Sequence, residues 1–135
     1  MPFDKCYRVA AVVLLMTGAV VGCKKSSEEV FLTRAQELRQ RAAPAGSTTS
    51  EPAAIVHSGM AMDTEWQLRC PLSESACRTL LSKQLELEFS KLRSTPQQIV
   101  YGRFAGGDSE RLEVIVVKRD GNITQYTVRF RAMPG

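Results

Sequence analysis

The sequence has few of the side chains that build common active sites. It contains one histidine and four cysteines among 135 residues, which leaves little for a metal cage or a histidine-based catalytic centre. It shows no carboxylate pair spaced for acid–base chemistry, no nucleophile beside a base and no glycine-rich phosphate loop. We therefore expect a protein that is not an enzyme and that uses no cofactor and no metal ion.

A large charge imbalance and a long hydrophobic run are also missing. The formal net charge is +4 with 24% charged residues, which is ordinary for a soluble domain and too small a surplus for a dedicated nucleic-acid binder. The main apolar run covers residues 9–22, about 21 Å as a helix, which is shorter than the roughly 30 Å hydrocarbon core of a bilayer. The length allows at most one ordinary domain.

The N-terminus is expected to carry an export signal. Lys5 and Arg8 precede the short apolar run, which is the pattern of a secretory signal. The run ends in Val20-Val21-Gly22-Cys23, which resembles the lipobox of bacterial lipoproteins. The resemblance covers residues 1–23. It implies that 1–22 are a signal peptide, that the Cys23 thiol takes a diacylglycerol, and that a fatty acid such as palmitate acylates the new amino terminus.

The residue after the lipid site indicates the membrane. In enteric lipoproteins an Asp at this position retains the protein in the inner membrane, and here it is Lys24. The resemblance therefore favours the periplasmic face of the outer membrane, with the inner membrane as the alternative. Membrane lipid, bound through acylated Cys23, is the first partner that the sequence implies.

Composition divides the mature chain into three parts. Residues 23–43 hold the lipidated cysteine and a membrane-proximal helix, which Ser26 caps and which carries one narrow apolar stripe. This stripe could dock on the chain's own domain, lie at the membrane or pair with another chain. Residues 44–53 are rich in Pro, Gly, Ser and Thr and predict a flexible linker. Residues 54–135 form the remaining domain.

Hydrophobic periodicity predicts an α+β fold for that domain. One or two strands over 55–70 come first, then a main helix from Ser73 to about Arg93, and then three antiparallel strands. The fold class is therefore an N-terminal helix and linker followed by a small antiparallel sheet with one main helix packed on it. The element order is similar to cystatin-like and nuclear-transport-factor-like cone folds, as a topological analogy only. The three final strands are expected over 99–104, 112–118 and 123–132.

The last two strands are predicted to form a hairpin around Asp120-Gly121. A three-residue loop over 119–121, with Gly121 left-handed, places Val114 opposite Tyr126 and groups the large apolar residues on one face. A two-residue loop would mix apolar and polar residues on that face. Because burial fixes strand register, we favour the three-residue loop.

Cys70 and Cys77 are expected to form a disulfide. Both remain in the exported chain, the compartment is oxidising, and the spacing is not that of a redox-active Cys-x-x-Cys motif. Two thiols alone cannot build a structural zinc site. The bond would join the end of a strand to the first turn of a helix.

The final strands also carry the candidate binding residues, Ile115, Val117 and Arg129. They fall on the polar side of the predicted hairpin, which is either a solvated sheet face or a weak docking surface for anionic groups. If no helix covers Ile115 and Val117, they favour a protein partner. The sequence thus predicts a non-catalytic binding or assembly module that contacts another envelope protein and no nucleic acid. The alternative is a small-ligand carrier with a pocket between helix and sheet.

Overall fold

The computed structural model describes residues 26–134, so the expected signal peptide, 1–22, and Cys23 lie outside the described residues. The chain divides into two compact units, Met1–Val30 and Phe31–Gly135. Of the first unit only 26–30 are described, as the start of a helix. The described elements are α2 (Ser27–Arg41), β1 (Thr48–Thr49), β2 (Val56–Ser58), β3 (Ala61–Cys70), α3 (Glu74–Leu85), β4 (Ser90–Ser94), β5 (Gln98–Ala105), β6 (Asp108–Asp120) and β7 (Ile123–Met133).

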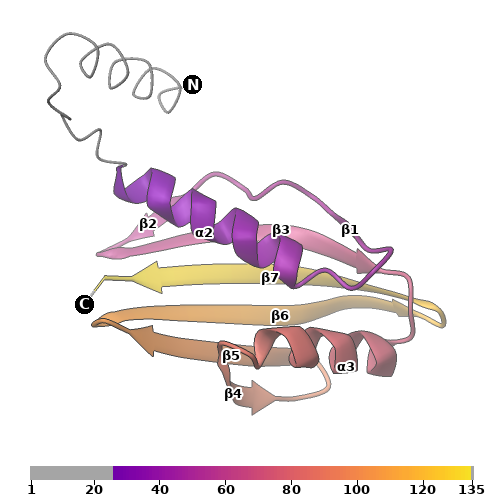
Figure 1. Cartoon of the computed structure of the whole chain (residues 1–135). Coiled ribbons are helices and arrows are strands. Elements are labelled where there is room, and N and C mark those ends of the chain that lie inside the picture. The colour runs from indigo at the N-terminus through magenta and orange to yellow at the C-terminus, as the bar shows by residue number, and fades with distance from the viewer. Residues whose placement is uncertain (1–25, 135) are drawn as a thin grey trace, which may run out of the picture. The chain divides into compact units, whose positions relative to one another are not determined.

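The strands form one antiparallel sheet, as the sequence predicts. Its order is β1-β3-β7-β6-β5-β4, and β2 also pairs with β3 (Figure 1). The two short strands share one edge of β3, since β1 pairs with Leu68 and Arg69, and β2 pairs with Ala61 to Asp63. At the other edge is β4, which pairs only with β5.

The core lies between the helices and one face of the sheet (Figure 1). Strand residues alternate in burial, so that Trp66 and Leu68 of β3 are buried while the residue between them is exposed. Phe31 of α2 stacks on Phe130 of β7 with ring centroids 5.0 Å apart. The largest fully buried side chains are Trp66, Tyr101, Tyr126, Phe130 and Leu38.

The sheet carries two packed helices, which corrects the expectation of one main helix. Phe31, Ala35, Leu38 and Ala42 of the predicted stripe are all buried in the same core as the α3 residues. The N-terminal helix therefore docks on its own domain. At its start the Glu29 N–H donates to Ser26 Oγ over 3.2 Å, which is the expected cap.

The main helix is shorter than its composition predicts. It begins after Ser73, whose hydroxyl caps the Ala76 N–H, and it ends at Leu85 rather than near Arg93. The Phe89 N–H donates to the Leu85 carbonyl, and the chain then turns into β4. Helix propensity alone predicts a helix that is too long. The helix ends earlier because Phe89 is buried in the core from the turn, and the residues after it pair with β5.

Residues 44–53 pair with the sheet, whereas their polar composition predicts a flexible linker. Strand β1 falls within this segment, and further along the Ala53 N–H donates to the Glu65 carbonyl over 2.8 Å. Arg39 of α2 also donates to Thr49 Oγ1 over 2.7 Å. The polar residues reflect a solvent-exposed sheet edge, which has the same composition as a linker.

Two turns also differ from the expected pattern. Gly59 has a positive φ of 62° and turns the chain within the region expected to hold one or two strands, 55–70, so that β2 and β3 form a hairpin. In the β6–β7 hairpin, Asp120 pairs with Ile123, so the loop is Gly121-Asn122 and has two residues rather than three. The three-residue prediction is therefore wrong.

A β-bulge explains why the predicted buried face of the hairpin is correct although the predicted loop length is wrong. The register shifts between Val116 and Lys118, which leaves Val117 as the extra residue. Val114 then lies opposite Val128, whereas the three-residue loop placed it opposite Tyr126. All three apolar side chains are buried as expected, because the bulge restores the alternation that the shorter loop would otherwise reverse.

Candidate functional site

The face of the sheet opposite the helices is open and polar. Three neighbouring strands, β3, β7 and β6, contribute three rows of side chains to it. The rows are Asp63–Arg131–Arg111, Glu65–Arg129–Glu113 and Gln67–Thr127–Ile115. None of these residues is buried. The helices pack on the other face, so this open face, defined by the three rows, is free for another molecule.

Ion pairs organise the charges of the open face. Arg131 forms a two-bond pair with Asp63, with Nε–Oδ1 at 2.7 Å and Nη2–Oδ2 at 3.1 Å. Arg129 pairs with Glu65 at 3.1 Å across the same two strands. These are exposed cross-strand pairs, each worth well under 1 kcal/mol, so they add little stability and can be exchanged for contacts with a partner.

A shallow groove of about 440 Å³ lies over these charges. Its volume falls in the range of small-ligand sites, although its walls are more polar than is usual for them. One side is apolar and comes from Ala53, Ala54 and Val56. The charged lining residues are Asp63, Glu65, Arg111, Glu113, Arg129 and Arg131. Positive and negative groups are balanced, which suits a partner carrying both signs of charge.

The structure brings two of the three candidate residues together. Arg129 lines the groove. Ile115 is on the same face, one row away, opposite Thr127 and Gln98. Val117 is the bulge residue of β6, with 59% of its surface exposed, and it is not part of the groove. Neither helix covers Ile115, which meets the condition that favours a partner.

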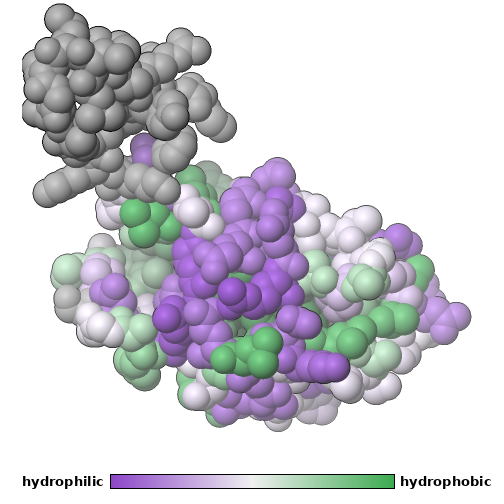
Figure 2. Space-filling view, in the orientation of Figure 1, coloured by the Kyte–Doolittle hydropathy of each residue, from purple (hydrophilic) through white to green (hydrophobic). Residues whose placement is uncertain are grey.

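A second charged cluster lies on the helix side of the sheet, and sequence reasoning missed it. Arg34 of α2 contacts Glu110 of β6 and Glu88 of the α3–β4 turn. Arg41 also contacts Glu88, and Arg103 contacts both acids. Figure 2 shows hydrophilic surface concentrated over α2 on this side. No periodicity links these residues, because four separate elements supply them.

Burial strengthens this helix-side cluster. Only 16% of the Arg34 side chain and 13% of the Glu110 side chain are exposed. Burial alone would raise the pKa of Glu88, but the hydrogen bonds and charges of Arg34, Arg41 and Arg103 outweigh it and lower that pKa. The guanidinium of Arg34 also lies over the ring of Phe89, 5.7 Å from its centroid. Glu37 also pairs with Arg34 and Arg41, so that three arginines face three acids. The cluster therefore holds α2 in place and is not a vacant site.

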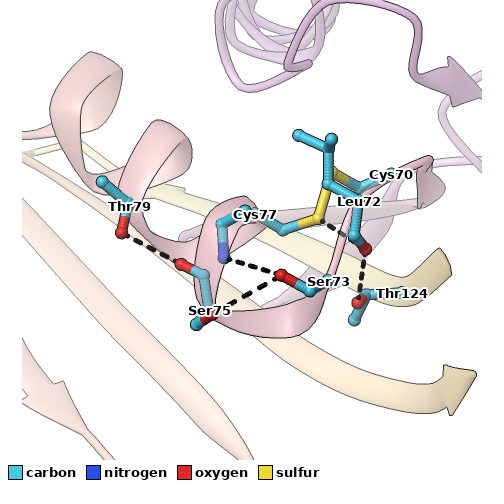
Figure 3. The surroundings of a disulfide bond; sticks show 8 residues. Cys70, Leu72, Ser73, Ser75, Cys77, Thr79 and Thr124 are labelled. Carbon is cyan, nitrogen blue, oxygen red and sulfur yellow. Dashed lines mark hydrogen bonds between the residues drawn. A yellow bond between two sulfur atoms is a disulfide. The ribbon is translucent and has the colours of Figure 1, made fainter. Parts of the chain in front are cut away.

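The expected disulfide is present. Cys70 at the end of β3 is bonded to Cys77 in the first turn of α3, with Cα atoms 6.4 Å apart (Figure 3). Both residues are fully buried. The Thr124 hydroxyl donates to the Leu72 carbonyl at 3.2 Å and ties the intervening loop to β7. The bond fixes the start of α3 against the sheet, which is a structural role.

The described part of the chain contains no metal-ligand cluster and no membrane-spanning helix. Across residues 26–134 no three His, Cys, Asp or Glu side chains are grouped as metal ligands. Within the same range no helix is long and apolar enough to cross a membrane. No protein-family model matches the chain, and no curated protein and no solved structure matches it.

Proposed function

We propose that this chain is an envelope lipoprotein, anchored through acylated Cys23, that acts by binding another envelope protein without catalysis. The anchor rests on the lipobox-like Val20-Val21-Gly22-Cys23 and on Lys24, which favours the outer membrane. The observation that supports a binding role is the open face. On this face the side chains of three strands lie in rows, and no helix covers them. One face of an antiparallel sheet is often left in water, so exposure alone does not support binding. The support is the groove and the apolar Ile115 on this otherwise polar face.

The chemistry of the open face indicates what it contacts. Its charges are paired, balanced and exposed, and Ile115 and the groove wall of Ala53, Ala54 and Val56 supply apolar area. A polar rim around modest apolar area is typical of non-obligate protein interfaces. A partner surface with both charge signs could replace the existing pairs without leaving a charge unpaired.

Co-purification tests this proposal. Chemically cross-linked envelopes should yield a specific protein with the wild-type chain. Ile115→Asp should reduce its recovery at least tenfold, because a new carboxylate would be desolvated in the interface. Leu80→Asp is the matched control, since Leu80 is an exposed apolar residue on α3, in the layer that packs on the opposite face. Equal recovery with both variants would argue against the open face.

A second candidate function, the small-ligand carrier, is favoured by one observation. Nε1 of Trp66 is buried on the helix side and has no hydrogen-bond partner among residues 26–134, and the hydroxyl of Tyr126, also buried there, interacts with Thr124 alone. Such inward polar groups are what an interior ligand site needs. Native mass spectrometry of the purified protein distinguishes the two functions, because a carrier should retain a stoichiometric small molecule.

The cone-fold analogy also stays a proposal. The order of the elements supports this analogy. The β2–β3 strand pair is followed by α3 and then by the four-strand meander β4–β7, whose last strand pairs with β3. A shared topology carries no function by itself.

A further inference from the structure

One end of the sheet carries exposed apolar side chains from three separate segments. Met60 lies in the β2–β3 turn, Phe104 lies near the end of β5, and Met133 ends β7. Their exposed fractions are 73%, 86% and 43%. Ser109 pairs with both Phe104 and Met133, and Met60 directly precedes β3. We call these three residues the apolar rim.

The rim and Phe31 of α2 are at the same end of the domain. Phe31 of α2 stacks on Phe130 of β7, and Met133 is three residues further along β7. At about 3.3 Å per strand residue, the rim is roughly 10 Å beyond Phe130. Figure 1 shows the β2–β3 turn, the β5–β6 turn and the end of β7 gathered at one end of the sheet.

Chain length limits how far this end can be from an anchored lipid. Eight residue steps separate Cys23 from Phe31, and the last four of them are helical. Four extended steps and four helical steps span at most about 20 Å. A lipid on Cys23 therefore keeps the membrane surface within that distance of Phe31, and the rim is well inside it.

Among the surfaces within that reach, the rim is an apolar one that a bilayer can accept, and Val30 and Leu32 of α2 are exposed apolar residues beside Phe31. The exposed surface of α2 carries Glu37 and the partly exposed Arg41, and burying these charges in lipid would desolvate them. The rim offers an aromatic ring and two thioethers. Lys24 and Lys25, next to the anchor, also attract anionic headgroups.

We infer that the apolar rim of Met60, Phe104 and Met133 inserts into the phospholipid surface beside the anchor and fixes the orientation of the domain. This inference rests on the proposed acylation of Cys23. In this arrangement the protein binds the membrane at two points, the lipid on Cys23 and the apolar rim at the end of the sheet. The strands then run away from the bilayer surface. The open face then looks sideways, along the membrane surface.

Site-directed spin labelling of the acylated full chain tests this inference. The mature protein is reconstituted into vesicles of phosphatidylethanolamine and phosphatidylglycerol with a nitroxide at Phe104→Cys or, as the matched control, Val117→Cys. Val117 is also exposed and apolar but lies near the opposite end of β6. Cys70 and Cys77 are bonded to each other, so the label finds one thiol.

The expected result is a difference between the two labels. The label at 104 should be accessible to dissolved oxygen and at least fivefold less accessible than the label at 117 to a water-soluble nickel chelate. Equal chelate accessibility at both positions overturns the inference. Thermal melting of the labelled proteins shows that both are folded. The intact mass of the protein distinguishes failure of the lipid anchor from failure of rim insertion. A chain without acyl groups refutes the lipid anchor as well as the insertion. An acylated chain whose label at 104 is accessible to the chelate refutes only the insertion of the rim.

Discussion

Arg34 on α2 and Glu110 on β6 form a two-bond ion pair, with Nε–Oε2 and Nη2–Oε1 both at 2.9 Å. The two residues are 76 positions apart in the sequence. Their pairing joins the N-terminal helix to the middle of the sheet, and Glu88 extends it to the α3–β4 turn. The helix that sequence composition separated from the domain is therefore held to it by charge as well as by packing.

Replacing Arg34 should destabilise the protein substantially. Arg34→Met leaves Glu88 and Glu110 largely buried with fewer partners, so we expect a loss of about 2 kcal/mol. Urea unfolding measures this loss. Arg129→Met is the matched control, because its ion pair with Glu65 is exposed and should contribute less than about 1 kcal/mol. Similar losses for both variants would mean that the helix-side cluster has no special role.

The same cluster predicts acid sensitivity. The folded-state pKa of Glu88 is lowered by its three arginine partners, which outweigh burial. A depressed carboxyl pKa contributes stability above its unfolded value, about 4.3, and this contribution is lost as pH falls through the folded value. Glu88→Gln should therefore be less stable than wild type at pH 7, and the difference should shrink as pH falls below about 4. A constant difference across that range would show that Glu88 does not titrate in this way.

Alkaline pH should weaken the core through Tyr126. Burial, with a contribution from Glu74, raises the pKa of Tyr126 to about 12. A raised tyrosine pKa contributes nothing below the unfolded value, about 10, where the hydroxyl is neutral in both states, and it costs stability as pH rises from there to about 12. Tyr126→Phe should flatten the loss of stability over this window, as followed by unfolding at several pH values. An unchanged alkaline slope would place the titration elsewhere.

The disulfide should matter despite its short ring. Loop-closure entropy gives about 2.5 kcal/mol for the Cys70–Cys77 ring. For a domain of this size, Cys70→Ser with Cys77→Ser should lower Tm by roughly 10 °C. Calorimetry of wild-type and variant proteins without reductant checks this. Ser75→Ala, at an exposed position of α3 between the two cysteines, should leave Tm nearly unchanged.

Removing the N-terminal helix should unfold the domain. A chain beginning at residue 54 lacks Phe31, Leu38 and the other buried α2 residues, and Phe130 loses its stacking partner. Truncating one such buried Phe to Ala costs about 3–5 kcal/mol. We expect the 54–135 fragment to lack a cooperative melting transition, whereas a chain beginning at residue 26 should keep one. A stable 54–135 fragment would restore the separate domain that composition suggests.

Local patterns in the sequence predict some features of the fold and miss others. The alternation of apolar and polar residues correctly placed Leu112, Val114 and Phe130 on the buried face. The Cys70–Cys77 disulfide was predicted from the oxidising compartment and from the number of cysteines in the exported domain. The exposed strands β1 and β4 were missed, because a solvated edge strand has the composition of a linker or of a helix end. The Arg34 cluster and the groove depend on strand order, which no local pattern encodes.

The central claim is that the open face binds another envelope protein. Site-specific photo-cross-linking in living cells tests it most directly, with the photoreactive residue at Gln67 on the open face or at Thr79 on α3. Both positions are exposed. The account predicts a discrete protein adduct from Gln67 and none from Thr79. Adducts from Thr79 alone, or from neither position while the protein is folded and acylated, would contradict it.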